Sequence, residues 1–194
     1  MSRVPLAFLL LLAACDRGPV QAPLAGRNDS VAQPEPSQNR AAEAPLNPPA
    51  PGQPGGLPDD RTPVSEGPFA ETSPQGAASV LERYFALVEQ RRYPDAWRLW
   101  SDAGRGSGKS EADFAADFGR YREYHANIGA PGDAEGAAGS VYVEVPVQVY
   151  GRLADGAAFN ATGTATLRRV NDVPGSTAAQ RRWHIHAIDV TPPR

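Results

Sequence analysis

SVYVEVPVQVYGRL, residues 140–153, decides the fold, because it alternates without interruption over the length of a long strand. Valine occupies every second position from residue 141 to residue 149, and the positions between carry Tyr142, Glu144, Pro146, Gln148 and Tyr150. Successive side chains of a strand point to opposite faces, so the pattern predicts one buried apolar face and one polar face. Proline has no N–H to donate, so we expect a bulge or a sheet edge at Pro146.

Further strands surround this segment in the sequence. Ala154-Asp155-Gly156 is a hairpin-turn sequence, and residues 157–170 alternate again on its far side. Residues 181–190 supply another alternating run, and YHANIG, residues 124–129, predicts a shorter strand. Together these segments predict an antiparallel meander.

Helical patterns come before the strands. Ser73-Pro74 has the form of a helix start, and apolar residues follow at helical spacing to about Gln90. Residues 94–101 predict a short helix, and a capping box at residues 110–113 predicts a third helix that runs to about residue 124. Helices followed by an antiparallel sheet indicate an α+β fold, with helices on one sheet face.

The order of these elements resembles the nuclear transport factor 2-like (cystatin-like α+β) fold. The resemblance rests on SPQGAASVLERYFALVEQRRYPDAWRLWS, residues 73–101, and on the closing WHIHAIDV, residues 183–190. It implies a domain over residues 73–194 with a curved sheet wrapped around the first helix to form a conical pocket. It also implies homodimerisation through the outer sheet face. The family includes isomerases, dehydratases and non-catalytic binding domains, so it does not fix one activity.

The first residues, MSRVPLAFLLLLAACDRG, have the parts of an export signal: a positive start, a short apolar run and small residues at a cleavage position. Leu12-Ala13-Ala14-Cys15 resembles the lipobox of bacterial lipoproteins. That resemblance implies a signal peptide over residues 1–14, a diacylglycerol on Cys15 and an acylated amino terminus. We therefore expect a lipid anchor in the bacterial cell envelope with the domain in the periplasm, and Asp16 favours the inner membrane. The alternative is an ordinary secretory signal with a coincidental cysteine.

Residues 15–72 predict a disordered tether. Residues 16–75 hold 13 of the 20 prolines and a single aromatic residue, Phe69. Too few apolar groups are present to offset the entropy of ordering the chain, and prolines interrupt helix and sheet. We expect this segment to act as a spacer rather than as a docking motif.

The charge and the cysteine content of the chain indicate which partners and cross-links to expect. Residues 76–194 carry 14 acidic and 14 basic residues, and a domain that binds nucleic acid normally shows a basic excess. We therefore expect no nucleic-acid partner. With Cys15 as the sole cysteine, no intrachain disulfide forms.

AGRGSGKS, residues 103–110, matches the phosphate-binding loop sequence of P-loop NTPases except that Ala103 stands in place of the first glycine. That loop requires a strand before it, whereas helical patterns precede this one. We interpret the stretch as a flexible connector, with a weak anion site at Arg105 and Lys109 as the alternative. No cofactor is expected.

The candidate site residues follow from residue type and from the expected pocket. Aromatic side chains near the first two helices predict a ligand pocket lined by Tyr84, Phe85, Tyr93, Trp97 and Trp100. Asp102, His125, Tyr84 and Tyr124 have side chains able to transfer protons, but no motif assigns any of them a catalytic position.

A metal site has one weak pair of candidates. His184 and His186 fall on the same strand face, and a zinc site would need a third ligand such as His125 or Glu144. We expect no metal and a non-catalytic domain that binds a protein or small ligand; the alternative is a periplasmic isomerase- or hydratase-like enzyme.

Overall fold

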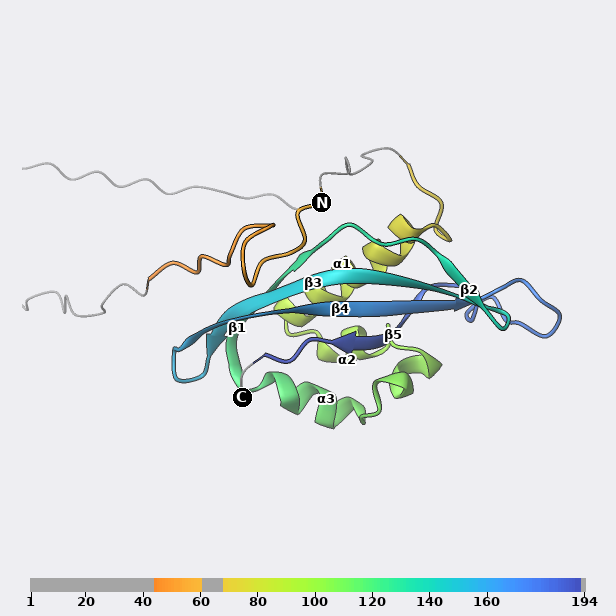
Figure 1. Ribbon diagram of the computed structural model, residues 1–194. Helices are drawn as coiled ribbons and strands as arrows, with labels where there is room; N and C mark the ends of the chain where they lie inside the picture. Colours follow the sequence, from red (N-terminus) through yellow and green to blue (C-terminus); the bar gives the residue numbers. More distant parts are fainter. Residues whose placement is uncertain (1–43, 61–67, 193–194) are drawn as a thin grey trace, which may run out of the picture. The chain divides into compact units, whose positions relative to one another are not determined.

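The computed structural model describes residues 44–60 and 68–192 (Figure 1). The predicted signal peptide, Cys15, Asp16 and the first part of the predicted tether lie outside the described residues. Among the helices of the described part, none is long and apolar enough to cross a membrane.

Helices come first in the folded part, as the sequence predicts. They are α1 (Pro74–Glu89), α2 (Tyr93–Trp97), the 3-10 helix η1 (Asp102–Ser107) and α3 (Glu111–Phe118). Ser73 Oγ accepts a hydrogen bond from Gly76 N at 3.2 Å, and Ser110 Oγ accepts one from Asp113 N at 3.1 Å, so both predicted N-caps are confirmed. The third helix ends at Phe118 rather than near residue 124, because Gly119 is its C-cap and the chain turns directly into a strand.

The strands form one antiparallel sheet. They are β1 (Tyr121–Ile128), β2 (Glu135–Ala137), β3 (Ser140–Leu153), β4 (Ala158–Val170) and β5 (His184–Asp189). The order is β1-β3-β4-β5, and β2 pairs with β3 beyond the end of β1. The predicted α+β class, with N-terminal helices packed on a curved antiparallel sheet, is confirmed (Figure 1).

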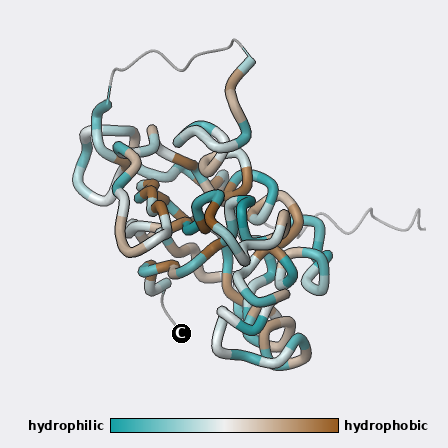
Figure 2. The backbone as a smooth tube through the Cα atoms, turned by 90° about the vertical axis from the view of Figure 1, so that its right-hand side faces the viewer, coloured by the Kyte–Doolittle hydropathy of each residue, from teal (hydrophilic) through white to brown (hydrophobic). Residues whose placement is uncertain are grey.

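The sheet face that packs against α1 is called the inner face. It carries the four buried valines of β3, at positions 143, 145, 147 and 149, and Leu167 and Ile185 of the neighbouring strands. Leu81 of α1 is fully buried within the same hydrophobic core. Figure 2 shows the apolar stretches of the chain gathered toward the middle of the domain. The alternation that predicts β3 therefore assigns its buried side correctly.

Pro146 lies on a central strand, and the register of β3 against β4 has no bulge there. The bulge is absent, whereas the alternative of a sheet edge holds locally, because neither β1 nor β2 pairs with Pro146. Gly129 N donates to Pro146 O at 2.8 Å, so the backbone groups of Pro146 face away from β4. On that side of β3, β1 pairs only with residues 147–153 and β2 only with residues 140–142. The strand pairing of β3 therefore requires no N–H from residue 146.

The free edge of the sheet at β5 is covered by the turn that follows α2. Trp100 forms a parallel bridge with Ile185, and Ile185 N donates to Leu99 O at 3.0 Å. Covering an edge strand removes unpaired peptide groups that would otherwise attract another chain.

The opposite face of the sheet is called the outer face, and residues 44–60 lie against it. We call this segment the strap. Gln148 of β3 donates hydrogen bonds to two strap carbonyls, those of Pro49 and Gly55. This contact is not anticipated by the composition of residues 15–72, which predicts a disordered spacer throughout.

Candidate functional site

A pocket of about 300 Å³ opens between α1, α3, β1 and the residues after β5. We call it the inner pocket. Aromatic and aliphatic side chains make up most of its wall: Tyr84, Phe85, Trp100, Phe114, Phe118, Tyr121, Tyr124, Ile188, Val190 and Pro192. Ser107, Lys109, Asp117 and Arg120 complete it. A concave apolar site with a few polar groups is the usual form of a small-molecule site.

The aromatic rings of this wall hold one another in place. Tyr84 meets Phe114 and Trp100 edge to face, with ring centroids 6.3 Å apart in both pairs. Phe118 meets Tyr124 edge to face at 5.3 Å. Such pairs are favourable because the ring edge is positive and the ring face negative. The wall is therefore set by packing rather than by flexible side chains.

Three tyrosines line this pocket, Tyr84, Tyr121 and Tyr124, and burial acts most strongly on the phenol groups of Tyr84 and Tyr124. Tyr84 is only 3% exposed, and burial raises its pKa far above its ordinary value, with the neighbouring Tyr124 adding to the rise. Burial likewise raises the pKa of Tyr124. Both groups therefore stay protonated at any physiological pH, and they serve as hydrogen-bonding groups rather than as general bases.

The indole of Trp100 presents a buried N–H. It lies close enough to the Tyr84 hydroxyl to oppose the rise of that group's pKa, without reaching good hydrogen-bond geometry. Among the described residues the N–H has no hydrogen-bond partner. The N–H is buried within the wall, so a ligand in the pocket meets the ring of Trp100 rather than this N–H.

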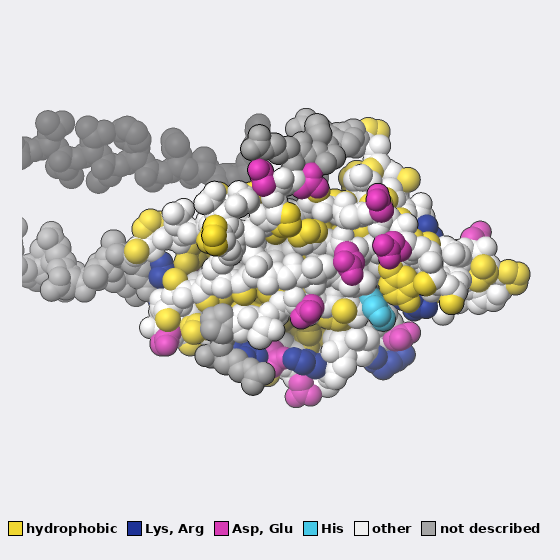
Figure 3. All heavy atoms as spheres, viewed as in Figure 1, with side chains coloured by type: hydrophobic (Ala, Val, Ile, Leu, Met, Phe, Trp, Pro, Cys, Tyr) yellow, Lys and Arg dark blue, Asp and Glu magenta, His cyan; other side chains and the backbone are white. Residues whose placement is uncertain are grey.

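The rim of the inner pocket is charged. Asp117 forms ion pairs with Lys109 and with Arg120, the latter at 3.3 Å between Asp117 Oδ1 and Arg120 Nη2. Two cations share one carboxylate, so the rim carries a net positive charge. Figure 3 shows basic side chains beside acidic ones along the lower edge, where Figure 1 draws α2 and α3.

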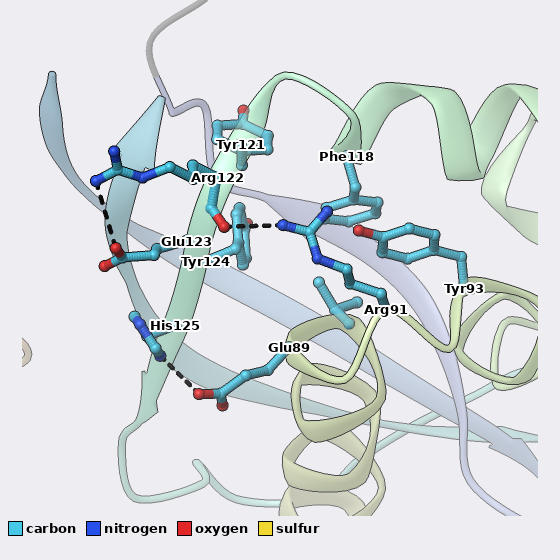
Figure 4. Close-up of a pocket in the computed structure, with 10 residues that line it drawn as sticks. Glu89, Arg91, Tyr93, Phe118, Tyr121, Arg122, Glu123, Tyr124 and His125 are labelled. Carbon is cyan, nitrogen blue, oxygen red and sulfur yellow. Dashed lines mark hydrogen bonds and ion pairs between the residues drawn. The ribbon is translucent and has the colours of Figure 1, made fainter. Parts of the chain in front are cut away.

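A second pocket, of about 250 Å³, adjoins the inner pocket, and Figure 4 shows the residues that line it. We call it the side pocket. It shares Phe118, Tyr121 and Tyr124 with the inner pocket. Tyr93 stacks on Phe118 at 5.4 Å, and Arg91 Nη2 donates to Arg122 O at 2.9 Å across the pocket.

The side pocket contains an imidazole–carboxylate pair. His125 Nδ1 lies 2.7 Å from Glu89 Oε1, and Figure 4 shows this pair at the end of the pocket farthest from Phe118. A carboxylate that orients an imidazole is an arrangement used in general acid–base catalysis. Both side chains here are partly exposed, 32% for His125 and 53% for Glu89, so solvent weakens their mutual attraction.

The predicted pocket residues separate into three places. Tyr84, Phe85 and Trp100 line the inner pocket, and Tyr93 lines the side pocket. Trp97 belongs to neither wall. Its indole N–H donates to Ser107 Oγ and to Lys109 O, both at 3.1 Å.

The glycine-rich stretch 103–110 is an ordered turn around the Trp97 ring. Gly104 has φ of 99°, and a Cβ there would lie 2.3 Å from that ring, so only glycine fits. Lys109 reaches the rim of the inner pocket, whereas Arg105 does not line it.

The possible proton-transfer residues are likewise scattered. Tyr84 lies in the inner pocket, Tyr124 lines both pockets, His125 lies in the side pocket, and Asp102 is exposed at the start of η1. The structure does not bring these four side chains together around one reacting position.

His184 and His186 flank the buried Ile185. His184 Nε2 lies 2.9 Å from Ala179 O, and His186 makes an edge contact with the Tyr142 ring at 5.6 Å. Neither His125 nor Glu144 joins them: within residues 44–60 and 68–192, no three His, Cys, Asp or Glu side chains are grouped to hold a metal ion.

Sequence reasoning missed part of the inner pocket. Phe114 and Phe118 are recognisable as one face of a helix, but nothing in their spacing says that they face a cavity. The ion pairs of Asp117 with Lys109 and Arg120 join residues on both sides of α3, and only the fold brings them to one rim.

Comparisons with known proteins give likenesses of backbone only. No family model and no curated protein matches the chain. A solved structure of the Kfla4162 protein from Kribbella flavida is similar to it, at 16% identity over 65% of this chain and 94% of that one, with a TM-score of 0.44. A nuclear transport factor 2 (NTF2-like) superfamily protein from Salmonella enterica serovar Typhimurium is similar at 12% identity over 62% and 91%, with a TM-score of 0.46.

Proposed function

We propose that this protein is a lipid-anchored lipoprotein of the bacterial cell envelope whose domain binds a small ligand in the inner pocket without chemical conversion. The ligand class that fits is a compact aromatic or aliphatic molecule with one anionic or hydrogen-bond-accepting group. The observation that carries the proposal is the pocket itself, in which an aromatic wall is combined with a rim that holds Lys109, Asp117 and Arg120.

The protonation of the pocket supports binding over catalysis. A general base works best when its pKa lies near the operating pH, and burial moves the pKa values of Tyr84 and Tyr124 away from that range. The carboxylate at the rim, Asp117, is held by Lys109 and Arg120. These groups are suited to recognising a fixed charge or dipole.

The membrane anchor is supported by the sequence alone. Cys15 stands directly after Leu12-Ala13-Ala14, and the chain has no other cysteine. Two or three acyl chains give stable membrane binding, since each buried CH₂ contributes about 0.8 kcal/mol. The anchor would keep the inner pocket in the periplasm, with Asp16 favouring the inner membrane.

The pocket is tested with the full chain and anilinonaphthalene sulfonate, a fluorescent probe with an aromatic body and an anionic group. Replacing Trp100→Ala removes one aromatic ring from the pocket wall, so the affinity for the probe is expected to fall about threefold to tenfold. Trp183→Ala is the matched control, because it removes an indole from the core at a position that does not line the pocket. Equal affinities of the two variants would refute the assigned role of Trp100.

The anchor is tested separately by Cys15→Ala. The wild-type chain is expected in the membrane fraction with a lipid mass on its first peptide, and the variant in the soluble fraction. A variant that stays in the membrane fraction would rule out lipidation as the anchor while leaving the pocket untouched.

A second candidate is an isomerase- or hydratase-like activity, favoured by the His125–Glu89 pair beside the side pocket. Its test is deuterium uptake by a β,γ-unsaturated cyclic ketone in heavy water, followed by NMR. Uptake that is lost in His125→Gln but kept in His184→Gln would establish this activity. Uptake no faster than in buffer would exclude it for this substrate class.

A further inference from the structure

The outer face of the sheet buries a polar side chain in the middle of its longest strand. Gln148 is 1% exposed, although the alternation of β3 places it opposite the core valines. A buried amide requires partners for its N–H groups and its oxygen. All of these partners are present, and two of them come from the strap.

Gln148 is the centre of a hydrogen-bond network. The two N–H groups of its Nε2 are shared among three acceptors, Pro49 O at 3.1 Å, Gly55 O at 3.0 Å and Asn160 Oδ1 at 2.9 Å. Its Oε1 accepts from Asn127 Nδ2 at 2.9 Å. Three strands are thus joined to a segment about a hundred residues away in the chain.

Other contacts extend the docking site along the face. Asn160 Nδ2 donates to Gly55 O at 2.8 Å, and Arg152 Nη2 donates to Ala44 O. Leu57 is 8% exposed, so the strap also buries an apolar side chain. Hydrogen bonds therefore hold the strap near both of its ends.

The strap has a compact shape of its own. Gly52 N donates to Leu57 O at 2.8 Å, which closes a turn around residues 53–56. Gly55 has φ of 80°, and a Cβ on Gly56 would lie 2.1 Å from Ala50 O. The glycines at these positions therefore fit one backbone shape that side chains would disturb. A spacer without structure makes no such demand.

We propose that the outer face of the sheet is a peptide-docking surface whose occupant is the strap of the same chain. The strap covers the Gln148 part of the outer face, so a second copy that paired through this part of the face would have to displace it. The docking also shortens the tether. Between Cys15 and the first docked residue lie 28 residues, 16–43, rather than the 57 of 16–72. At about 3.5 Å per residue the greatest span falls from about 200 Å to about 100 Å. This second consequence rests on the proposed lipidation of Cys15; the docking itself does not.

Hydrogen–deuterium exchange of the full chain tests the docking. In the wild type, the amides of Gly52 and Gly56 are expected to exchange at least about tenfold more slowly than in an unstructured peptide. Gln148→Ala is expected to raise their exchange about tenfold, and Gln53→Ala, an exposed strap residue of the same type, is expected to leave it unchanged. Wild-type amides that exchange at the unstructured rate would overturn the proposal.

A second pair of variants tests the docking independently, in case Gln148→Ala fails to fold. Gly55→Ala strains a backbone at φ of 80° and places a Cβ 3.2 Å from Asn160 Nδ2. Gly139→Ala imposes the same φ strain in open space, in the turn between β2 and β3. Only Gly55→Ala is expected to speed exchange in the strap, with the amides of β3 unchanged in both. Equal effects of the two variants on the strap would contradict the docking.

Dilution and the anchor variant separate the remaining explanations. Protection that stays constant over a hundredfold dilution supports docking within one chain, and protection that disappears would show that a second copy supplies the strap. Cys15→Ala is expected to keep full strap protection, so failure of the anchor and failure of the docking give different results.

Discussion

The two faces of β3 are buried by different means. On the inner face four valines lose contact with water against α1 and its neighbours, with no directional bonds. On the outer face Gln148 is equally buried, but hydrogen bonds to the strap and to adjacent strands replace those it would make with water. Apolar burial tolerates approximate fit, whereas polar burial fails if one partner is removed. The two faces should therefore respond differently to mutation.

The largest effect is expected on the inner side. Leu81 of α1 is fully buried in the core, so Leu81→Ala removes apolar contacts and leaves a cavity. We expect the free energy of unfolding to fall by about 2–5 kcal/mol, measured by urea denaturation. Glu82→Ala, at the exposed neighbouring position, is the control and should change it by less than about 0.5 kcal/mol. A loss under about 1 kcal/mol in Leu81→Ala would mean that this face is not the main core.

The matching change on the outer face is Gln148→Leu. It keeps the side-chain volume but leaves Pro49 O and the amides of Asn127 and Asn160 short of a partner. We expect a loss of about 1–3 kcal/mol in the same urea experiment, smaller than that of Leu81→Ala. If Gln148→Leu were neutral or stabilising, the network would contribute specificity of docking but no net stability.

The contrast between the two faces also explains why the sequence predicts the buried valines but not the docked strap. The period of two in residues 140–153 is enough to place Val143 and Val147 in the core, because apolar burial leaves a periodic signal. The burial of Gln148 leaves none, because it depends on the carbonyls of residues 49 and 55, and backbone carbonyls are present at every position. The strap is missed for the same reason: its prolines and glycines predict disorder, and its ordering comes from contacts with a distant strand.

The candidate site was predictable to a similar degree. Tyr84, Phe85 and Trp100 follow from aromatic residues on the first two helical segments. Trp97 differs from Trp100 by three positions, yet its ring lies on Gly104 because the turn after α2 sends the two indoles to different places. The chain returns over the Trp97 ring through positive φ values at Asp102, Ala103 and Gly104, of which only the glycine has a sequence signal.

We also expect the buried Tyr84 to make the free energy of unfolding depend on pH above about pH 10. An unfolded tyrosine has a pKa of 10.0, and burial raises that of Tyr84 in the folded state. Above about pH 10 the unfolded chain loses this proton while the folded chain keeps it, so the free energy of unfolding falls as pH rises. For one such group, the free energy of unfolding falls by up to about 1.4 kcal/mol per pH unit. Urea denaturation between pH 8 and pH 11 measures it, and Tyr84→Phe should lose this part of the slope. Gln148 does not titrate, so Gln148→Leu should leave the slope unchanged.

The smallest effect is expected at the rim of the inner pocket. Asp117→Asn removes the carboxylate that pairs with Lys109 and Arg120, and all three side chains are more than a third exposed. Ion pairs of this kind contribute at most about 1 kcal/mol, so stability should change little. The freed cations should instead strengthen binding of anilinonaphthalene sulfonate about twofold to fivefold at low salt, and the gain should shrink in 0.5 M NaCl because salt screens exposed charges. Asp133→Asn, away from this rim, changes the net charge by the same amount and should leave the affinity unchanged. A gain that persists at high salt would show that Asp117 obstructs the probe by its shape, and the rim would then have no electrostatic role in recognition.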